Sequence, residues 1–170
     1  MSDATTKPEP LDQLSSVLYD ALREHARRLI GGGQAVDATD LVHEAYVRLA
    51  RSERYEAMER AEFLALTATV IRRLFIDEVR RGDRERLEPV RVTLSGANDL
   101  AAGGEVDFLR LDAALDRLGT LDPRQARIVE LRFFAGLPLE EVSTLLGVAP
   151  RTITREWGMA RAWLKRELNR

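Results

Sequence analysis

The chain is most informative in the stretch Pro138-Leu-Glu-Glu-Val-Ser-Thr-Leu-Leu-Gly147-Val-Ala-Pro150-Arg-Thr-Ile-Thr-Arg-Glu-Trp157. Before Gly147 the apolar residues fall on one helical stripe, and a glycine tolerates the positive φ at which a helix commonly ends. Pro150 suits the first turn of a second helix, whose apolar residues recur at three- and four-residue steps from Ile153 to Leu168. The stretch therefore predicts a helix-turn-helix, a motif that reads DNA with its second helix.

Length and composition limit the other classes of protein that the chain could form. With 170 residues, 45% of them hydrophobic, it has material for one or two small domains and not for a large enzyme with a deep cleft. It contains no cysteine, which excludes disulfides and thiolate metal sites and suits a reducing cytoplasm. No apolar run approaches the roughly 20 residues that span a bilayer, and the N-terminus lacks the layout of a signal peptide. We therefore expect a soluble, cytoplasmic protein without a membrane span.

Charge is unevenly distributed, although the net charge is only −2. Basic residues are concentrated after Gly147 and again between Arg72 and Arg86, whereas the segment from Asp37 to Glu62 is rich in acids. Two basic clusters with an acidic surface between them suit a protein that contacts DNA at two places and a protein partner elsewhere. The alternative is that these arginines belong to solvated helix faces.

Helical periodicity covers most of the chain, and no segment shows the alternation of a convincing strand. Three helical patterns, over residues 11–30, 41–49 and 63–79, predict one helical bundle at residues 11–87. A disordered tail is expected at residues 1–10.

The second half of the chain begins with a change of composition. Glycine and proline punctuate residues 88–107, which predicts a flexible linker. Residues 108–170 predict a unit of four helices, in which Asp122 caps and Pro123 begins one helix. The expected fold class is all-α, with two small helical domains joined by the linker.

Three further segments stand out beside the helix-turn-helix. They are Asp37-Ala-Thr-Asp40-Leu-Val-His-Glu-Ala-Tyr-Val-Arg-Leu49, Phe63-Leu-Ala-Leu-Thr-Ala-Thr-Val-Ile-Arg-Arg-Leu-Phe-Ile-Asp77-Glu-Val-Arg-Arg81 and Leu121-Asp-Pro-Arg-Gln-Ala-Arg-Ile-Val-Glu-Leu-Arg-Phe-Phe134. In order and spacing the chain resembles an extracytoplasmic-function (ECF) RNA polymerase sigma factor of the sigma-70 family. Arg155-Glu-Trp157 and Ala160-Arg-Ala-Trp-Leu164 resemble its ECF-like branch in particular. The resemblance covers about residues 11 to 170, apart from the linker.

The resemblance implies an alternative sigma factor, which binds core RNA polymerase, directs it to specific promoters and assists promoter melting. In the family, the helix that matches Asp40 to Leu49 binds a coiled coil of the largest polymerase subunit. A mixture of charges with apolar edges suits such a helix pair. The implied polymerase-binding residues are Asp40, Leu41, Glu44, Ala45 and Arg48.

Promoter DNA is the second implied partner. The segment from about Arg51 to Arg81 matches the part that reads and melts the minus-10 element, where cations hold phosphates and aromatic groups hold unstacked bases. The implied minus-10 residues are Arg54, Tyr55, Phe63, Arg72, Arg73, Asp77, Arg80 and Arg81. The helix-turn-helix would dock in the major groove of the minus-35 element with its outward residues Pro150, Arg151, Thr152, Thr154, Arg155 and Gly158.

Each assignment has a structural alternative. Phe63 and Phe75 lie on apolar helical stripes, which favours core packing over base stacking. Trp157 and Trp163 are assigned to the core or its rim, and Asp77 either pairs with a neighbouring arginine or contacts DNA.

The residue inventory gives no sign of catalysis. The two histidines, His25 and His43, lack neighbours at metal-ligand spacing, and no nucleophile-base-acid set is present. We expect no metal, no cofactor and no enzymatic activity.

The second helix of the motif departs from the family pattern. Ala149 stands where a serine often caps the helix, a cap worth about 1 kcal/mol. Thr154 and Gly158 stand where a basic residue is common, and a glycine weakens an exposed helix interior by roughly 1 kcal/mol relative to alanine. We expect altered and weaker minus-35 recognition.

Two other functions stand as alternatives. A helix-turn-helix regulator acting without replacing sigma should dimerise on a palindromic site. A sigma-like decoy would bind polymerase or a regulator without productive DNA contact, but the basic residues on both DNA-facing segments argue against it. The chain has no long C-terminal extension that might sense a signal, so regulation by a separate partner, such as an anti-sigma protein, or by expression level is expected. A flexible linker permits open and closed domain arrangements.

Overall fold

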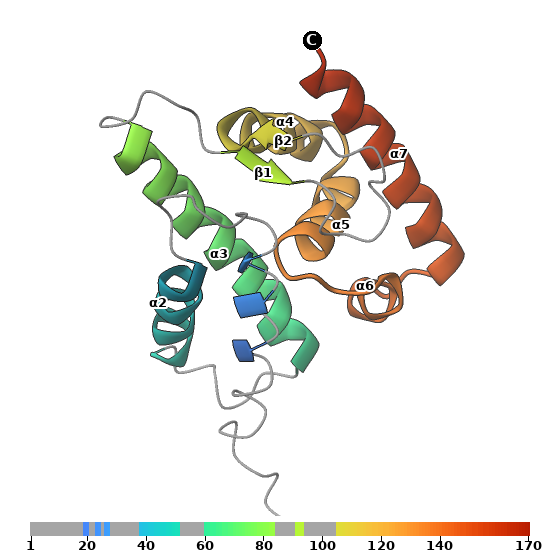
Figure 1. Cartoon of the computed structure of the whole chain (residues 1–170). Helices are drawn as coiled ribbons and strands as arrows, with labels where there is room; N and C mark the ends of the chain where they lie inside the picture. Colours follow the sequence, from blue (N-terminus) through green and yellow to red (C-terminus); the bar gives the residue numbers. More distant parts are fainter. Residues whose placement is uncertain are drawn as a thin grey trace, which may run out of the picture.

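The computed structural model describes residues 19, 20, 23, 24, 26, 27, 38–51, 60–83, 91–93 and 105–170, and most of these residues are helical (Figure 1). The all-α prediction is therefore confirmed. Much of the predicted first helix, over residues 11–30, lies outside the described residues.

The N-terminal unit is built around α2 (Ala38–Ala50) and α3 (Arg60–Asp83). Apolar residues at three- and four-residue steps give each helix one apolar face, and the two faces pack against each other. The buried side chains include Leu41, Val42, Ala45 and Leu49 of α2 and Phe63, Leu64, Ile71, Leu74, Phe75 and Val79 of α3.

The C-terminal unit contains α4 (Phe108–Leu121), α5 (Pro123–Phe133), α6 (Leu139–Leu146) and α7 (Pro150–Leu168). The Asp122 carboxylate accepts a hydrogen bond from the Gln125 N–H at 3.0 Å, and Pro123 occupies the first turn. The predicted start of this helix is therefore confirmed.

Two short strands occur where the sequence predicted none. β1 (Arg91–Thr93) and β2 (Glu105–Asp107) pair in antiparallel register, with Val92 opposite Val106. Three residues are too few to show a strand's alternation, so periodicity could not find them. Both strands lie within residues 88–107. The proposed domain boundaries and the flexibility of the linker stay predictions, because the other residues of this segment lie outside the described part.

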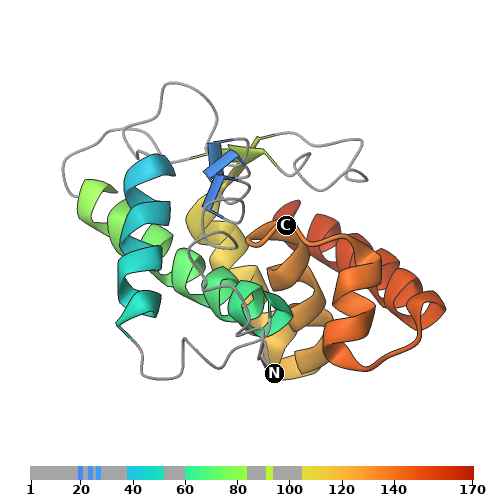
Figure 2. The same ribbon diagram turned by 90° about the horizontal axis from the view of Figure 1, so that it is seen from below.

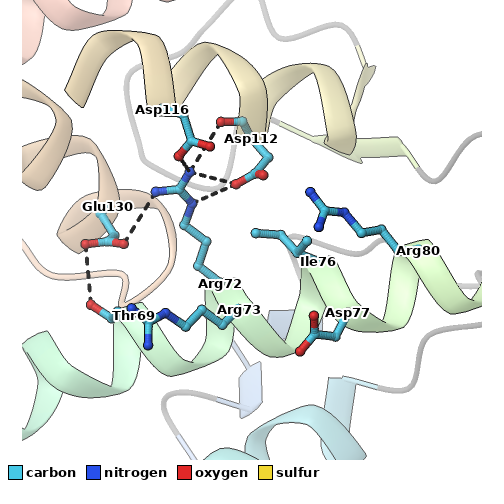
Figure 3. A pocket seen from close by; sticks show the side chains of 9 residues that line it. All are labelled: Thr69, Arg72, Arg73, Ile76, Asp77, Arg80, Asp112, Asp116 and Glu130. Carbon is cyan, nitrogen blue, oxygen red and sulfur yellow. Dashed lines mark hydrogen bonds and ion pairs between the residues drawn. The ribbon is translucent and has the colours of Figure 1, made fainter. Parts of the chain in front are cut away.

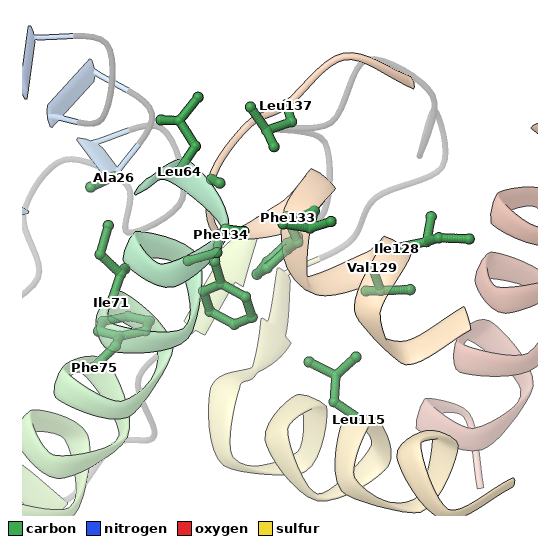
Figure 4. Packing of buried hydrophobic residues seen from close by; sticks show 14 of the residues in the cluster. Ala26, Leu64, Ile71, Phe75, Leu115, Ile128, Val129, Phe133, Phe134 and Leu137 are labelled. Carbon is green, nitrogen blue, oxygen red and sulfur yellow. The ribbon is translucent and has the colours of Figure 1, made fainter. Parts of the chain in front are cut away.

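The described parts of the two units share one core. α3 lies between α2 and the C-terminal helices, as the view from below also shows (Figure 2). The rings of Phe75 in α3 and Phe108 in α4 have centroids 4.2 Å apart, and Phe134 meets Phe108 edge-on at 6.2 Å. Figure 4 shows the side chains of α3 facing those of α5. In this structure α3 therefore packs directly against α4 and α5.

Candidate nucleic-acid interface

The turn between α6 and α7 has the geometry of a helix-turn-helix corner. Gly147 adopts φ 63° and ψ 31°, in the left-handed region that favours glycine, and ends α6 as predicted. The Val148 N–H donates to the Ser143 carbonyl at 3.1 Å, while the Ser143 hydroxyl donates to the Val148 carbonyl at 2.6 Å. The Ser143 side chain, for which the sequence predicts no role, therefore closes the turn.

The start of α7 lacks a side-chain cap. Ala149 occupies the N-cap position without a capping hydrogen bond, as expected from the sequence, and Pro150 follows in the first turn. The Ala149 carbonyl accepts the Thr152 N–H at 2.9 Å and the Ile153 N–H at 3.1 Å, so the backbone alone begins the helix.

One face of α7 is open to solvent near its N-terminal end. Arg151, Thr154 and Arg155 are exposed, while Thr152 and Gly158 are half-buried. The Thr154 hydroxyl donates to the Pro150 carbonyl at 3.0 Å. A side chain added at Gly158 would meet no atom within 4 Å at its Cβ, so this position has room for a larger residue. The structure thus places the predicted minus-35 residues on one side of a single helix; we call this side the recognition face.

The opposite side of α7 fixes the rotation of the recognition face. Ile153, Trp157 and Ala160 are at most 2% exposed, which confirms that Trp157 belongs to the core. The indole ring of Trp157 has the guanidinium carbon of Arg132 at 5.4 Å and that of Arg161 at 5.5 Å from its centroid. This arrangement is the geometry of cation–π contacts.

An ion pair that sequence analysis missed ties α7 to α5. Glu156, between Arg155 and Trp157, is only 5% exposed. Its carboxylate accepts hydrogen bonds from Arg124, one of them from Nε at 2.7 Å. These hydrogen bonds, and then the charge of Glu156, raise the pKa of Arg124. No periodic signal links two residues 32 positions apart, although a glutamate on an apolar stripe is itself a hint of a buried partner.

The second predicted cationic surface lies along α3. Arg73, Asp77, Arg80 and Arg81 are exposed. Arg81 pairs with Glu78 of the same helix at 2.9 Å, and its Nε also donates to the Asp77 carbonyl at 3.4 Å. Part of this surface borders a pocket of about 440 Å³ between α3 and helices α4 and α5 (Figure 3).

Arg72 differs from the other arginines of α3. Its Nε and Nη2 donate to the Asp112 carboxylate at 2.9 and 2.7 Å, and Nη2 also donates to Asp116 at 2.7 Å. Burial of the guanidinium lowers the pKa of Arg72, but the hydrogen bonds and charges of Asp112 and Asp116 outweigh burial, and the pKa is raised. In this arrangement Arg72 is engaged with acids and does not join Arg73 and Arg80 on the surface.

Several other predicted residues also lie away from the surfaces assigned to them. Phe63 is 4% exposed and packs in the core, as its structural alternative predicted. Leu41 and Ala45 are at most 5% exposed, because they form the apolar face of α2 that packs on α3. Arg54 and Tyr55 lie outside the described residues.

The outer side of α2 carries the remaining predicted polymerase contacts. Asp40, Glu44 and Arg48 are exposed, and Arg48 Nη2 donates to Glu44 Oε1 at 2.6 Å. Alternating charge on a helix side of this kind can hold another helical partner.

Within the described residues, no cluster of three or more histidine, aspartate or glutamate side chains could hold a metal ion. The same part of the chain contains no helix with the length and apolarity needed to traverse a membrane.

The fold and these surfaces define a mostly helical protein that carries a helix-turn-helix with an exposed recognition face. Among known protein families, the ECF sigma factor family matches residues 6–170. The chain belongs to the ECF sigma factor family.

Two named sigma factors are similar to this chain. The chain is 31% identical over 136 residues to the ECF RNA polymerase sigma factor BldN of Streptomyces coelicolor. The match covers 76% of this chain and 51% of BldN, so the chain spans about half the length of that relative. The sigma factor RpoE of Bartonella quintana, solved in complex with the anti-sigma factor NepR, is 20% identical with a TM-score of 0.44, over 94% of this chain and 96% of RpoE.

Proposed function

We propose that this chain is an alternative sigma factor, which binds core RNA polymerase in the cytoplasm, directs it to specific promoters and assists promoter melting. The observation that carries the proposal is the recognition face, where Arg151 and Arg155 stand exposed at the start of the second helix of a helix-turn-helix. Membership of the ECF sigma factor family supports the same reading.

The recognition face would enter the major groove of the minus-35 element. Arg151 and Arg155 have the donors that bind guanine edges or phosphates, and the exposed hydroxyl of Thr154 adds a weaker polar group. Pro150, Thr152 and Gly158 complete the surface that faces the groove.

The remaining contacts divide between α3 and α2. Arg73, Arg80 and Arg81 would hold the phosphates of the opened minus-10 region, because a cationic helix suits single-stranded DNA. Asp40, Glu44 and Arg48 on the outer side of α2 would bind core polymerase. No chemistry is assigned to this chain, since the polymerase supplies the catalytic site.

The proposal is tested by transcription in vitro with core RNA polymerase, this protein and a fragment library of its own genome. Starts that depend on the protein and share two spaced upstream motifs are expected. Core binding without such starts would favour the decoy or a missing partner. A chain that neither binds core polymerase nor supports starts would favour the helix-turn-helix regulator.

The polymerase contact has its own test. Replacing Asp40 and Glu44 together by alanine is expected to weaken the pull-down of core polymerase while preserving the helical content, because both side chains are exposed. Glu140→Ala, an exposed acid in the first turn of α6, serves as the control. An unchanged pull-down by the double variant would contradict the assignment.

A further inference from the structure

Arg72 meets carboxylates from two helices of the other unit. Besides Asp112 and Asp116 of α4, Glu130 of α5 lies 3.7 Å from its Nη1 (Figure 3). Nη2 also donates to the backbone carbonyl of Asp112 at 3.3 Å. One guanidinium of α3 is thus surrounded by acids that sequence analysis did not single out.

This cluster is more enclosed than an ordinary surface ion pair. The side chain of Arg72 is 18% exposed, that of Asp112 is 8% exposed and that of Glu130 is 13% exposed, whereas Asp116, at the edge of the cluster, is 73% exposed. Exposed ion pairs contribute little because water and salt screen them, whereas an enclosed, hydrogen-bonded pair is screened much less. The three carboxylates can therefore compete with the phosphate of a nucleic acid for binding to the Arg72 guanidinium.

A second set of contacts joins the same two helical regions, with the arginine now supplied by α5 and the acceptors by α3. Arg127 of α5 donates to the Ala65 carbonyl at 3.0 Å and to the Thr69 hydroxyl at 2.9 Å, both in α3. The ring contact between Phe75 and Phe108 supplies an apolar part of the interface. Polar and apolar contacts together hold α3 against the C-terminal unit.

We propose that Asp112, Asp116 and Glu130 form an intramolecular latch, which takes the place of DNA phosphate on Arg72 and keeps the free chain in a closed, minus-10-inactive state. The proposal rests on the function proposed above and adds its regulation. Carboxylates and phosphates bind a guanidinium through the same forked hydrogen bonds, so the two exclude each other. The acids also place negative charge beside Arg73 and Arg80, which line the same pocket.

The latch acts on one DNA surface only. Arg151 and Arg155 of the recognition face are exposed in the same closed arrangement. The free chain is therefore able to present its minus-35 surface while its minus-10 surface is restrained. A partner that binds the open arrangement more tightly than the closed one shifts the population toward the open arrangement. The size of the shift is set by the ratio of the two affinities.

The test compares two variants that change the net charge equally. Asp112→Asn with Asp116→Asn removes the two α4 carboxylates with little change of shape, and Asp20→Asn with Glu140→Gln neutralises two acids elsewhere. The probe is a short fluorescent single-stranded oligonucleotide of mixed sequence, titrated without polymerase. The latch variant is expected to bind it roughly tenfold more tightly than wild type, and the control variant within about twofold. Equal gains in both variants, or no gain in either, would overturn the proposal.

Substituting Arg72 in the latch variant completes a double-mutant cycle, which tests whether the gain in oligonucleotide affinity depends on this arginine. Adding Arg72→Gln to the latch variant is expected to remove the gain, because the released cation is then missing. A gain that persists without Arg72 would contradict the latch. Circular dichroism of each variant checks that the helices remain.

The arrangement of the units can be measured independently of DNA. The chain has no cysteine, so His43→Cys in α2 and Met159→Cys in α7, both exposed, allow nitroxide labels at two chosen points. Pulsed electron resonance is expected to give one main distance for wild type and a broader, longer distribution for the latch variant. An identical distribution would overturn the latch. Loss of transcription with a normal opening response would instead count against the sigma function alone.

Discussion

The recognition face of α7 and the arginine side of α3 use the same residue type in different states. Arg151 and Arg155 extend into solvent, whereas Arg72 is held by acids of α4 and α5. On α7 the buried acid Glu156 pairs with Arg124 of α5, while Arg151 and Arg155 lie on the exposed side of the same helix. On α3 the acids of the neighbouring helix α4 reach Arg72 itself. Two helices with similar basic sequences therefore differ in which of their arginines stay exposed.

The largest effect on stability is expected from removing the buried ring that packs behind the recognition face. Trp157→Ala would remove a ring that is 2% exposed in the core behind it, and should lower the free energy of unfolding by about 3–5 kcal/mol. Chemical denaturation followed by circular dichroism measures the loss. Trp163→Ala, at a half-buried position of the same helix, is expected to cost clearly less; equal losses would show that Trp157 is not the anchor.

Substituting one arginine on each surface distinguishes the roles of α7 and α3. Arg155→Ala is expected to weaken binding of a duplex carrying the minus-35 element by about 1–3 kcal/mol. Arg72→Ala should leave the same affinity unchanged, because that side chain is engaged with Asp112. Fluorescence anisotropy across a salt series gives both results. Arg166→Ala, an exposed arginine near the other end of α7, is the control, and a loss as large as that of Arg155→Ala would argue against a local contact.

A smaller effect is expected from adding a cation to the recognition face. A Cβ added at Gly158 would meet no atom within 4 Å, so the substitution Gly158→Arg is sterically allowed. It should raise the free energy of unfolding by about 1 kcal/mol, because arginine has a higher helix propensity than glycine. It should also tighten minus-35 binding and steepen its dependence on salt by roughly one phosphate contact. Gly158→Ala separates the two contributions, since it changes helix propensity without charge. If arginine and alanine behave alike in the salt series, position 158 does not contact DNA.

The smallest effect is expected at the start of α7. Ala149→Ser should supply the missing cap and raise stability by about 0.5–1 kcal/mol, because its hydroxyl can accept a backbone N–H of the first turn. Thermal unfolding measures the gain. Ala113→Ser, exposed within α4, should give no gain, and a similar rise there would contradict capping as the cause.

Features that depend on a few neighbouring residues could be predicted from the sequence. Gly147 at the corner, Asp122 at a helix start and Trp157 in the core all follow from spacing and residue type, and the structure confirms each. The ion pairs of Arg72 and Glu156 could not be predicted, because they join residues far apart in sequence whose meeting depends on how whole helices pack. Arg72 looked like its neighbours along the helix, and only tertiary structure distinguishes it.

The pairing of β1 with β2 has a consequence for promoter geometry. Because Thr93 pairs with Glu105 and Arg91 with Asp107, the two ends of residues 91–107 lie side by side, and β2 leads directly into α4. In the proposed sigma factor, residues inserted between positions 94 and 104 would enter between two strands that are already paired. We expect such an insertion to leave the preferred spacer between promoter elements unchanged. An insertion between positions 84 and 90, which separates α3 from β1 in the sequence, is expected to relax that preference.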